Sequence, residues 1–303
     1  MRVLISGASG LIGTALSAAL DARGDEVIRL VRPSSTAGSP TSVSWDPVAG
    51  TLDQHHLEDQ GPIDAVVHLA GAGIADRRWS AARKAEILAS RTTSTELVVR
   101  AICELAAAPA VLVSGSAIGY YGSRGDEILT EASSCGNGFL AMVCAAWEAA
   151  TAPAAAAGIR TVLARTGIVL SPAGGALAKQ LPLFRAGVGG RLSSGSQWFS
   201  WITLDDEVAA LVAAIDDPSL FGPVNLTSPN PVTNAIFTKA LGRALHRPAG
   251  LAVPAAALKL ALGAELVDEA LLASQRVQPA ALDAAGFEFR DPDLDTALAR
   301  LLS

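Results

Sequence analysis

The chain has 303 residues, half of them hydrophobic, and a formal net charge of −6, which suits one large α/β domain or two smaller ones. The negative charge and the lack of a basic run exclude a general nucleic-acid surface, and no uncharged apolar stretch suits a membrane span. Cys103, Cys135 and Cys144 have a spacing that favours neither zinc nor a disulfide framework, so we expect no metal site and a reducing, cytoplasmic location.

The first predicted elements are an apolar strand at residues 3–5, a glycine turn and a helix that Gly24 ends. A second apolar strand at residues 27–32 completes a βαβ unit of about 30 residues, and the early first strand leaves no room for a targeting segment. Glycine permits close backbone approach, and a helix N-terminus offers unpaired N–H groups to a pyrophosphate. The turn therefore predicts a dinucleotide site, with a ligand-free glycine turn as the alternative. The residues expected to hold the pyrophosphate are Gly7, Ser9, Gly10, Leu11 and Ile12.

Arg32 ends the second predicted strand, where dinucleotide folds usually carry an acidic residue for the ribose 2′-OH. An arginine binds a 2′-phosphate, which an acidic side chain would repel. This position favours NADP(H) over NAD, although a solvated arginine is the alternative. Ser34 and Ser35 are further candidate phosphate donors.

Further strands are predicted at residues 63–71, 110–116 and 160–170, with helices at 80–105 and 138–157. This alternation predicts an α/β fold with a doubly wound, parallel, Rossmann-like sheet. Ligands bind such sheets at the carboxyl ends of the strands. The residues expected beside the dinucleotide are Leu69, Ala70, Gly71, Ser114 and Gly167. His68 is expected to be a core histidine, and Glu148 either faces the cleft or is structural.

The pattern changes after residue 170, where glycine-rich loops surround a short helix. Trp198, Phe199 and Trp201 form either an aromatic wall for a substrate or packing between domains. We predict a nucleotide-binding domain at residues 1–228, with substrate-cleft insertions from about 171. A small, mainly helical C-terminal substrate or cap region is predicted at 229–303.

Three segments resemble the extended, epimerase-like branch of the short-chain dehydrogenase/reductase superfamily: SGASGLIG at 6–13, DAVVHLAG at 64–71 and SGSAIGYYG at 114–122. The resemblance narrows to the bacterial YfcH-like subgroup and a small C-terminal domain of unknown function. It rests on residues 45–47, 78–79, 90–91, 147–148, 195–197, 201–202, 231–234, 275–279 and 286–289. It implies nicotinamide cofactor binding and a substrate cleft beneath the C-terminal region. Ser116 matches the serine that holds the substrate's reacting oxygen.

The superfamily's usual Tyr-x-x-x-Lys pair is absent from this chain. A lysine one helical turn after a tyrosine lowers the phenol pKa and allows proton exchange with a substrate. Here Phe139 or Leu140 stands at the tyrosine position, and Val143 or Cys144 at the lysine position. Tyr120, four residues before Arg124, and Tyr121 are candidate substitute acids, or they line the cleft and pack against the loop.

These observations predict an NADP(H)-dependent oxidoreductase of atypical type, acting on a small carbonyl or hydroxyl substrate whose identity the sequence does not give. One alternative is a nucleotide-sugar epimerase or dehydratase, and another is a nonenzymatic NADP(H)-binding sensor or scaffold. No nucleic-acid or membrane partner is expected, and a homodimer is a further hypothesis.

Overall fold

An eight-stranded sheet forms the centre of the computed structural model, which describes residues 1–33 and 41–303. The strand order is β13-β8-β6-β5-β1-β2-β3-β4; all pairs are parallel except β3 with β4. The order reverses at β1, which creates the crevice where such sheets bind ligands. The predicted doubly wound sheet is therefore confirmed. The strands are β1 (Arg2–Ser6), β2 (Glu26–Val31), β3 (Ser42–Asp46), β4 (Thr51–Leu52), β5 (Ala65–His68), β6 (Val111–Ala117), β8 (Arg160–Thr166) and β13 (Gly222–Leu226).

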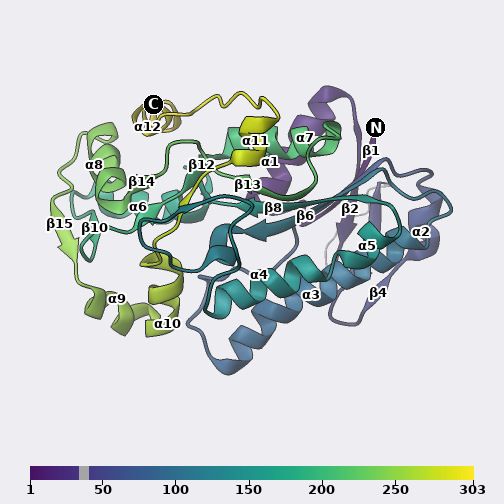
Figure 1. The fold of residues 1–303 in the computed structure, drawn as a ribbon, viewed down its shortest axis with the longest axis horizontal. Coiled ribbons are helices and arrows are strands. Elements are labelled where there is room, and N and C mark those ends of the chain that lie inside the picture. Colours follow the sequence, from purple (N-terminus) through teal and green to yellow (C-terminus); the bar gives the residue numbers. More distant parts are fainter. Residues whose placement is uncertain (34–40) are drawn as a thin grey trace.

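Helices cover both faces of this sheet (Figure 1). One layer holds α1 (Leu11–Arg23), α7 (Leu204–Asp216) and α11 (Ala280–Ala284). The other holds α3 (Ala81–Cys103), α4 (Phe139–Ala149) and α5 (Ala152–Ala156), while α2 (Gln54–Asp59) follows β4. Alternate residues of the strands face opposite layers, so Val3 and Ile5 join one apolar core and Leu4 the other.

The predicted helix at 80–105 is confirmed as α3, which starts where the Ser80 side chain accepts a hydrogen bond from the Arg83 amide. The single helix predicted at 138–157 is wrong, because α4 and α5 are separate. Thr151 Oγ1 donates to the Glu148 carbonyl at 2.7 Å, and Pro153 has no N–H to continue the helical ladder.

The single strand predicted at 160–170 is also wrong. It divides at Gly167 into β8 and β9 (Ile168–Ser171), and β9 pairs with β12 (Trp201–Thr203) outside the main sheet. A Cβ atom at Gly167 would lie 2.8 Å from the Ser200 carbonyl oxygen. Glycine is needed there because two backbone segments approach closely.

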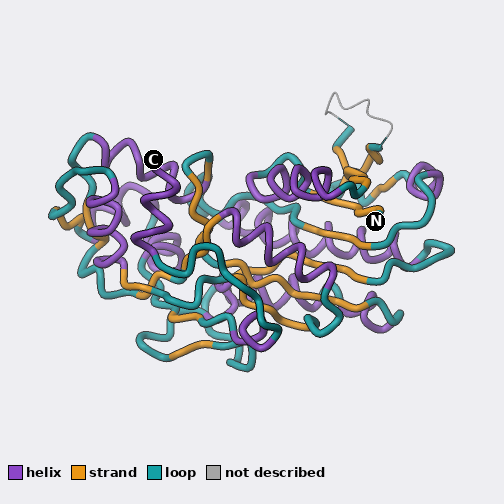
Figure 2. The backbone as a smooth tube through the Cα atoms, turned by 90° about the horizontal axis from the view of Figure 1, so that it is seen from above, coloured by secondary structure: helices purple, strands orange, loops and turns teal. Residues whose placement is uncertain are grey.

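A second body, rich in helices, is seen beside the sheet from above (Figure 2). Its apolar core includes Trp201 and Phe237, and Phe199 stacks on Phe237 with ring centroids 4.4 Å apart. Phe199 and Trp201 therefore pack between elements rather than form a substrate wall. The elements of this part are α6 (Gly175–Arg185), β10 (Gly190–Leu192), β11 (Trp198–Phe199), β12, β14 (Val232–Thr233), α8 (Asn234–Ala244), β15 (Leu251–Val253), α9 (Ala255–Leu262), α10 (Ala264–Leu266), the π-helical turn η2 (Val267–Leu271), β16 (Arg276–Val277) and α12 (Leu294–Leu302).

The C-terminal region also returns to the nucleotide-binding body. β16 pairs with β7 (Ile128–Leu129), α11 packs against β13, and Leu282 of α11 is fully buried in a sheet core. Residues 229–303 are mainly helical, as predicted, yet the segment 281–289 shares a core with the sheet, whereas α12 packs in the core of the second body.

One stretch, residues 139–156, has the length and apolar composition of a membrane-spanning helix. In the fold it is divided between α4 and α5, and α4 packs against α3 and β6. The stretch therefore belongs to the layer of helices on the sheet.

Candidate functional site

The glycine turn forms a narrow cradle between the end of β1 and the start of α1. Gly7 has φ +74°, and a Cβ atom on it would lie 2.8 Å from the Leu69 carbonyl carbon. A Cβ atom on Gly13 would lie 2.2 Å from the Gly7 oxygen. Gly10 occupies the N-cap of α1 and has no side chain to cap the first-turn amides. These features fit a pyrophosphate held by backbone N–H groups, and the contacts of the individual residues with it stay a prediction.

The second strand bearing predicted cofactor contacts is β5, which ends at His68. His68 is fully buried, and its ring nitrogens bond the Ser6 and Ser94 hydroxyls at 2.6 and 3.1 Å. Burial lowers the pKa of His68 to about 4, so its ring is neutral. The expectation of a satisfied core histidine is confirmed.

The loop after β5 carries Leu69, Ala70 and Gly71, and α3 holds it in place. The Ala72 amide donates to Ser90 Oγ at 3.0 Å, and Arg91 Nη1 donates to the Ala72 carbonyl at 3.0 Å. Leu69 and Ala70 also border the cradle, since the Ala70 amide nitrogen would lie 2.9 Å from a Gly7 Cβ.

Ser116, Glu148 and Arg165 form a polar chain at the ends of β6 and β8. Ser116 Oγ donates to Glu148 Oε1 at 2.6 Å. Arg165 donates two hydrogen bonds to the same carboxylate, from Nε to Oε1 and from Nη2 to Oε2, both 2.8 Å long. The side chains of Arg165 and Glu148 are only 4% and 10% exposed, so solvent screens this bidentate pair weakly. The carboxylate holds the pKa of the Arg165 guanidinium above its ordinary value despite burial.

The fold brings these three residues together through strand register and helix packing. Ser116 lies opposite Arg165 in the β6–β8 pairing, and α4 carries Glu148 over the sheet. A Cβ atom at Gly115 would lie 2.9 Å from the Trp147 ring, so Gly115 lets α4 approach β6. The sequence predicts Ser116 and the end of β8 at the site, but it does not predict the Glu148–Arg165 pair. The register of β6 against β8 is the signal that would have found it.

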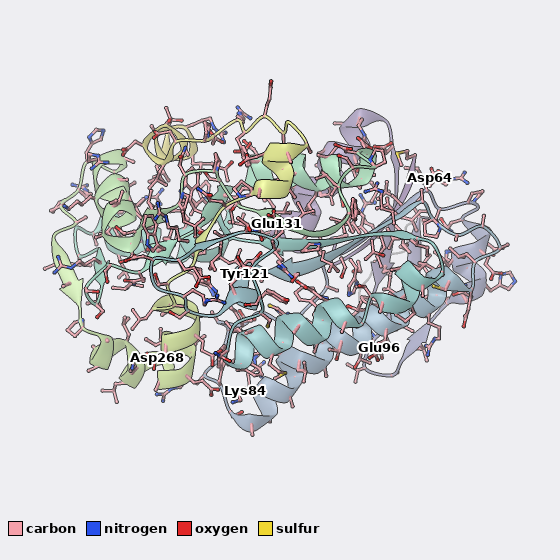
Figure 3. The ribbon with its side chains drawn as sticks, viewed as in Figure 1. Asp64, Lys84, Glu96, Tyr121, Glu131 and Asp268 are labelled. Carbon is pink, nitrogen blue, oxygen red and sulfur yellow. The ribbon has the colours of Figure 1, made fainter. Side chains whose placement is uncertain are left out.

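Tyr121 is fully buried, and Figure 3 marks it near the centre of the molecule. Its hydroxyl donates to Asn225 Oδ1 at 2.7 Å and accepts from Arg165 Nη1 at 3.0 Å. Burial raises the pKa of the Tyr121 phenol. Internal partners therefore hold the Tyr121 hydroxyl, and its role as a substitute acid stays a prediction.

Tyr120 is half-buried, and the Arg165 guanidinium lies over its ring at 3.5 Å from the centroid. Arg124, proposed from sequence as the neighbouring cation, instead pairs with Glu127 through two bonds of 2.8 and 2.7 Å. Arg165 is thus the cation beside both tyrosines, and a proton-donor role for Tyr120 stays a prediction.

The positions of the missing Tyr-x-x-x-Lys pair lie on the first turns of α4, as expected. Val143 and Cys144 are buried there, and burial raises the pKa of the Cys144 thiol to about 12. Neither residue exchanges protons at neutral pH.

Three other predicted cofactor residues have distinct outcomes. Ser114 is fully buried within β6, and its contact with a cofactor stays a prediction. The Gly167 amide donates to the Leu226 carbonyl at 2.9 Å, and a cofactor contact by Gly167 stays a prediction. Arg32 follows β2 directly and is exposed beside the cradle strand, whereas Ser34 and Ser35 lie outside the described residues.

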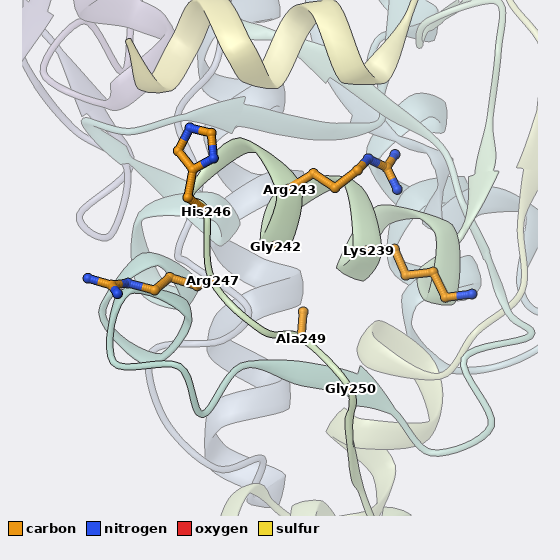
Figure 4. A pocket seen from close by; sticks show the side chains of 7 residues that line it. All are labelled: Lys239, Gly242, Arg243, His246, Arg247, Ala249 and Gly250. Atoms are coloured by element: carbon orange, nitrogen blue, oxygen red, sulfur yellow. The ribbon is translucent and has the colours of Figure 1, made fainter.

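The depression shown in Figure 4, about 670 Å³ in volume, lies elsewhere, at the C-terminal end of α8. Its cationic side chains, Lys239, Arg243 and Arg247, extend outward from the depression rather than converge on it. Cations favour helix C-termini, where carbonyl groups carry partial negative charge. This depression is not the candidate site.

A doubly wound sheet, a glycine cradle at its switch point and a serine at the end of β6 define a Rossmann-like nucleotide-binding protein of the short-chain dehydrogenase/reductase type. The chain belongs to the NAD dependent epimerase/dehydratase family, whose model matches residues 3–226. A second model, a domain of unknown function (DUF1731), matches residues 253–301. The resemblance found in the sequence is confirmed.

Relatives match over nearly the whole chain. The chain is 50% identical over 296 residues to "Epimerase family protein MT2273" of Mycobacterium tuberculosis, covering 98% of this chain and 96% of that protein. A structure of human epimerase family protein SDR39U1 (isoform 2) with NADPH has a TM-score of 0.88 and 32% identity, covering 100% of this chain and 99% of that one. A nucleoside-diphosphate sugar epimerase from Corynebacterium glutamicum has a TM-score of 0.81 and 39% identity, covering 100% of this chain but 58% of that one.

Proposed function

We propose that this protein is an NADP(H)-dependent oxidoreductase that interconverts a carbonyl and a hydroxyl group on a small substrate. The observation that carries the proposal is the Ser116–Glu148–Arg165 chain. It places a hydroxyl and a carboxylate in direct contact at 2.6 Å, at the sheet edge that also holds the cofactor cradle.

Two features support NADP(H) as the cofactor. Arg32 follows β2 beside the cradle and carries the charge that a 2′-phosphate needs. The human relative of similar fold was solved with NADPH. The cofactor would supply hydride transfer, with Gly7, Gly10 and the first turn of α1 binding its pyrophosphate.

The chain's own residues supply orientation and proton transfer. In the oxidative direction Ser116 Oγ would accept the proton of the substrate hydroxyl while its own proton passes to Glu148, so that the proton released by oxidation ends on the carboxylate. In the reductive direction the same proton returns through Ser116 to the oxygen formed from the carbonyl. Arg165 keeps Glu148 aimed at Ser116 in both directions, and the buried setting strengthens these contacts.

Sugar epimerisation is the second candidate, favoured by the printed description of the Corynebacterium relative. That chemistry removes and returns hydride on one substrate, so its cofactor stays bound through the cycle. An NAD or NADP molecule that survives purification and does not exchange with added NADPH would favour epimerisation over net oxidation or reduction.

The test is NADPH oxidation with a panel of aldehydes and ketones, measured for the wild type, Ser116→Ala and Glu148→Gln. We expect turnover to fall about 10²- to 10⁴-fold in Glu148→Gln, because it removes a proton-transfer group. Glu96→Gln, an exposed acid on α3, is the matched control and keeps full activity. If Ser116→Ala and Glu148→Gln both turn over at the wild-type rate, the proposed proton transfer through Ser116 and Glu148 is refuted. A wild type that binds NADPH but reduces none of the panel points to a sensor or scaffold.

A further inference from the structure

The helix that carries Glu148 lacks the usual side-chain cap at its start. Gly138, the N-cap of α4, has φ 110° and ψ 173°, which suits glycine rather than the serine, threonine or aspartate that commonly caps helices. The first amides of α4 therefore need acceptors from elsewhere in the fold.

Glu269 of the C-terminal region supplies both acceptors from 130 residues away. Its Oε1 accepts from the Phe139 amide at 2.9 Å, and its Oε2 accepts from the Leu140 amide at 2.8 Å. A carboxylate at this end also complements the positive end of the helix dipole. Gly138 and Glu269 depend on each other, since a Cβ atom on Gly138 would lie 3.0 Å from the Glu269 carboxyl carbon.

Further contacts at the same place join three parts of the chain. Lys84 of α3 pairs with Glu265 at 2.7 Å and lies over the Phe139 ring, 5.0 Å from its centroid. Trp79 packs edge-on against the same ring with centroids 5.0 Å apart. Figure 3 shows the start of α3, marked by Lys84, beside the C-terminal segment marked by Asp268.

The geometry points to Glu269 as a positioning residue that fixes α4, and through it Glu148, against the end of β6. This inference rests on the proposed function for its catalytic consequence. It assigns the C-terminal region, residues 253–301, a part in assembling the Ser116–Glu148–Arg165 chain. When this region is seated, the first turn of α4 is capped and Glu148 lies 2.6 Å from Ser116; when Glu269 is withdrawn, the helix start frays.

The test compares Glu269→Ala and Glu269→Gln with Asp268→Asn, a control that removes one acidic charge from the neighbouring exposed residue. Amide hydrogen exchange across residues 139–148 is measured by mass spectrometry in the full chain, with and without NADPH. Alkylation of Cys144, which is 4% exposed on the second turn of α4, is followed in the same samples at peptide resolution.

We expect Glu269→Ala to raise exchange in the first turn of α4 by roughly 2- to 30-fold, the range for losing a helix cap. Glu269→Gln keeps one acceptor oxygen and gives an intermediate rise, while Asp268→Asn matches the wild type. If Glu269→Ala does not fold, the Gln variant decides the question. If hydrogen exchange and Cys144 alkylation in Glu269→Ala equal those in Asp268→Asn, Glu269 does not cap α4 and the inference is overturned.

Turnover separates a positioning role from a merely structural one. Positioning predicts that kcat for NADPH oxidation falls in the order wild type, Gln, Ala, while the NADPH Kd stays within about twofold. Raised exchange with unchanged kcat overturns the catalytic role. No turnover in the wild type refutes the proposed function and its catalytic consequence, while exchange still decides whether Glu269 caps α4.

Discussion

Glu207 is a carboxyl group that the fold buries with one partner, and replacing it with a group that does not titrate tests the physical reasoning directly. It lies on α7 and is fully buried, and Thr166 Oγ1 donates to its Oε1 at 2.8 Å. Among the described residues, its Oε2 has no hydrogen-bond partner. Burial raises the pKa of Glu207 from 4.5 to about 8, so the folded protein keeps it protonated at neutral pH.

The stability consequence has a definite sign. Unfolding exposes Glu207 and returns its pKa to 4.5, so between pH 4.5 and about 8 the unfolded chain releases a proton that the folded chain retains. The contribution of Glu207 to the free energy of unfolding is fully present below pH 4.5. It falls by up to about 1.4 kcal/mol per pH unit between pH 4.5 and about 8. The full loss is about 5 kcal/mol, an upper bound because buried sites relax.

The perturbation is Glu207→Gln, which preserves shape and does not titrate. The free energy of unfolding is measured by urea denaturation at several pH values from about 5 to 8 for both proteins. We expect the variant to gain stability over the wild type as pH rises, by up to about 4 kcal/mol across that range. Parallel pH profiles for the two proteins refute the assignment of a protonated, buried Glu207.

Three further predictions concern the site. Tyr121→Phe leaves Asn225 Oδ1 and Arg165 Nη1 without their shared partner and lowers the free energy of unfolding by about 1–3 kcal/mol in urea titrations. The turnover of Tyr121→Phe stays near that of the wild type. A loss of turnover as large as that in Glu148→Gln would instead identify Tyr121 as the proton donor. Gly13→Ala weakens NADPH binding more than tenfold in fluorescence titrations, because its Cβ would lie 2.2 Å from the Gly7 oxygen. Gly250→Ala is the control and leaves NADPH binding unchanged, because a Cβ there meets open space. Arg32→Ala weakens NADPH binding by about 10- to 100-fold and leaves NADH binding within about twofold, and an equal loss for both contradicts the 2′-phosphate contact.

Local patterns in the sequence were sufficient to predict the cradle and the order of strands and helices around it. Glycine spacing, apolar strands and helix-ending residues act over short distances, so Gly7, Gly13 and Gly24 indicate their own surroundings. The sequence predicts one helix at 138–157 because its apolar pattern runs through both α4 and α5. The break between them depends on the Thr151 side chain and on Pro153.

The polar part of the site depends on contacts between residues far apart in the chain. Ser116 and Arg165 face each other only through the β6–β8 register, and Glu148 reaches them only because Gly115 admits the Trp147 ring. Glu269 is still more remote, capping α4 from the C-terminal region. Residue type and spacing within one segment carry no information on these pairings.

The most direct test of hydride transfer through this site uses NADPH deuterated at C4 of the nicotinamide, incubated with the protein and a small-molecule extract. We expect mass spectrometry to find a product that carries one deuterium from a single face of the ring, formed at least about 100-fold more slowly by Glu148→Gln. The absence of any labelled product, or its formation at the wild-type rate by Glu148→Gln, contradicts an oxidoreductase that works through Ser116 and Glu148.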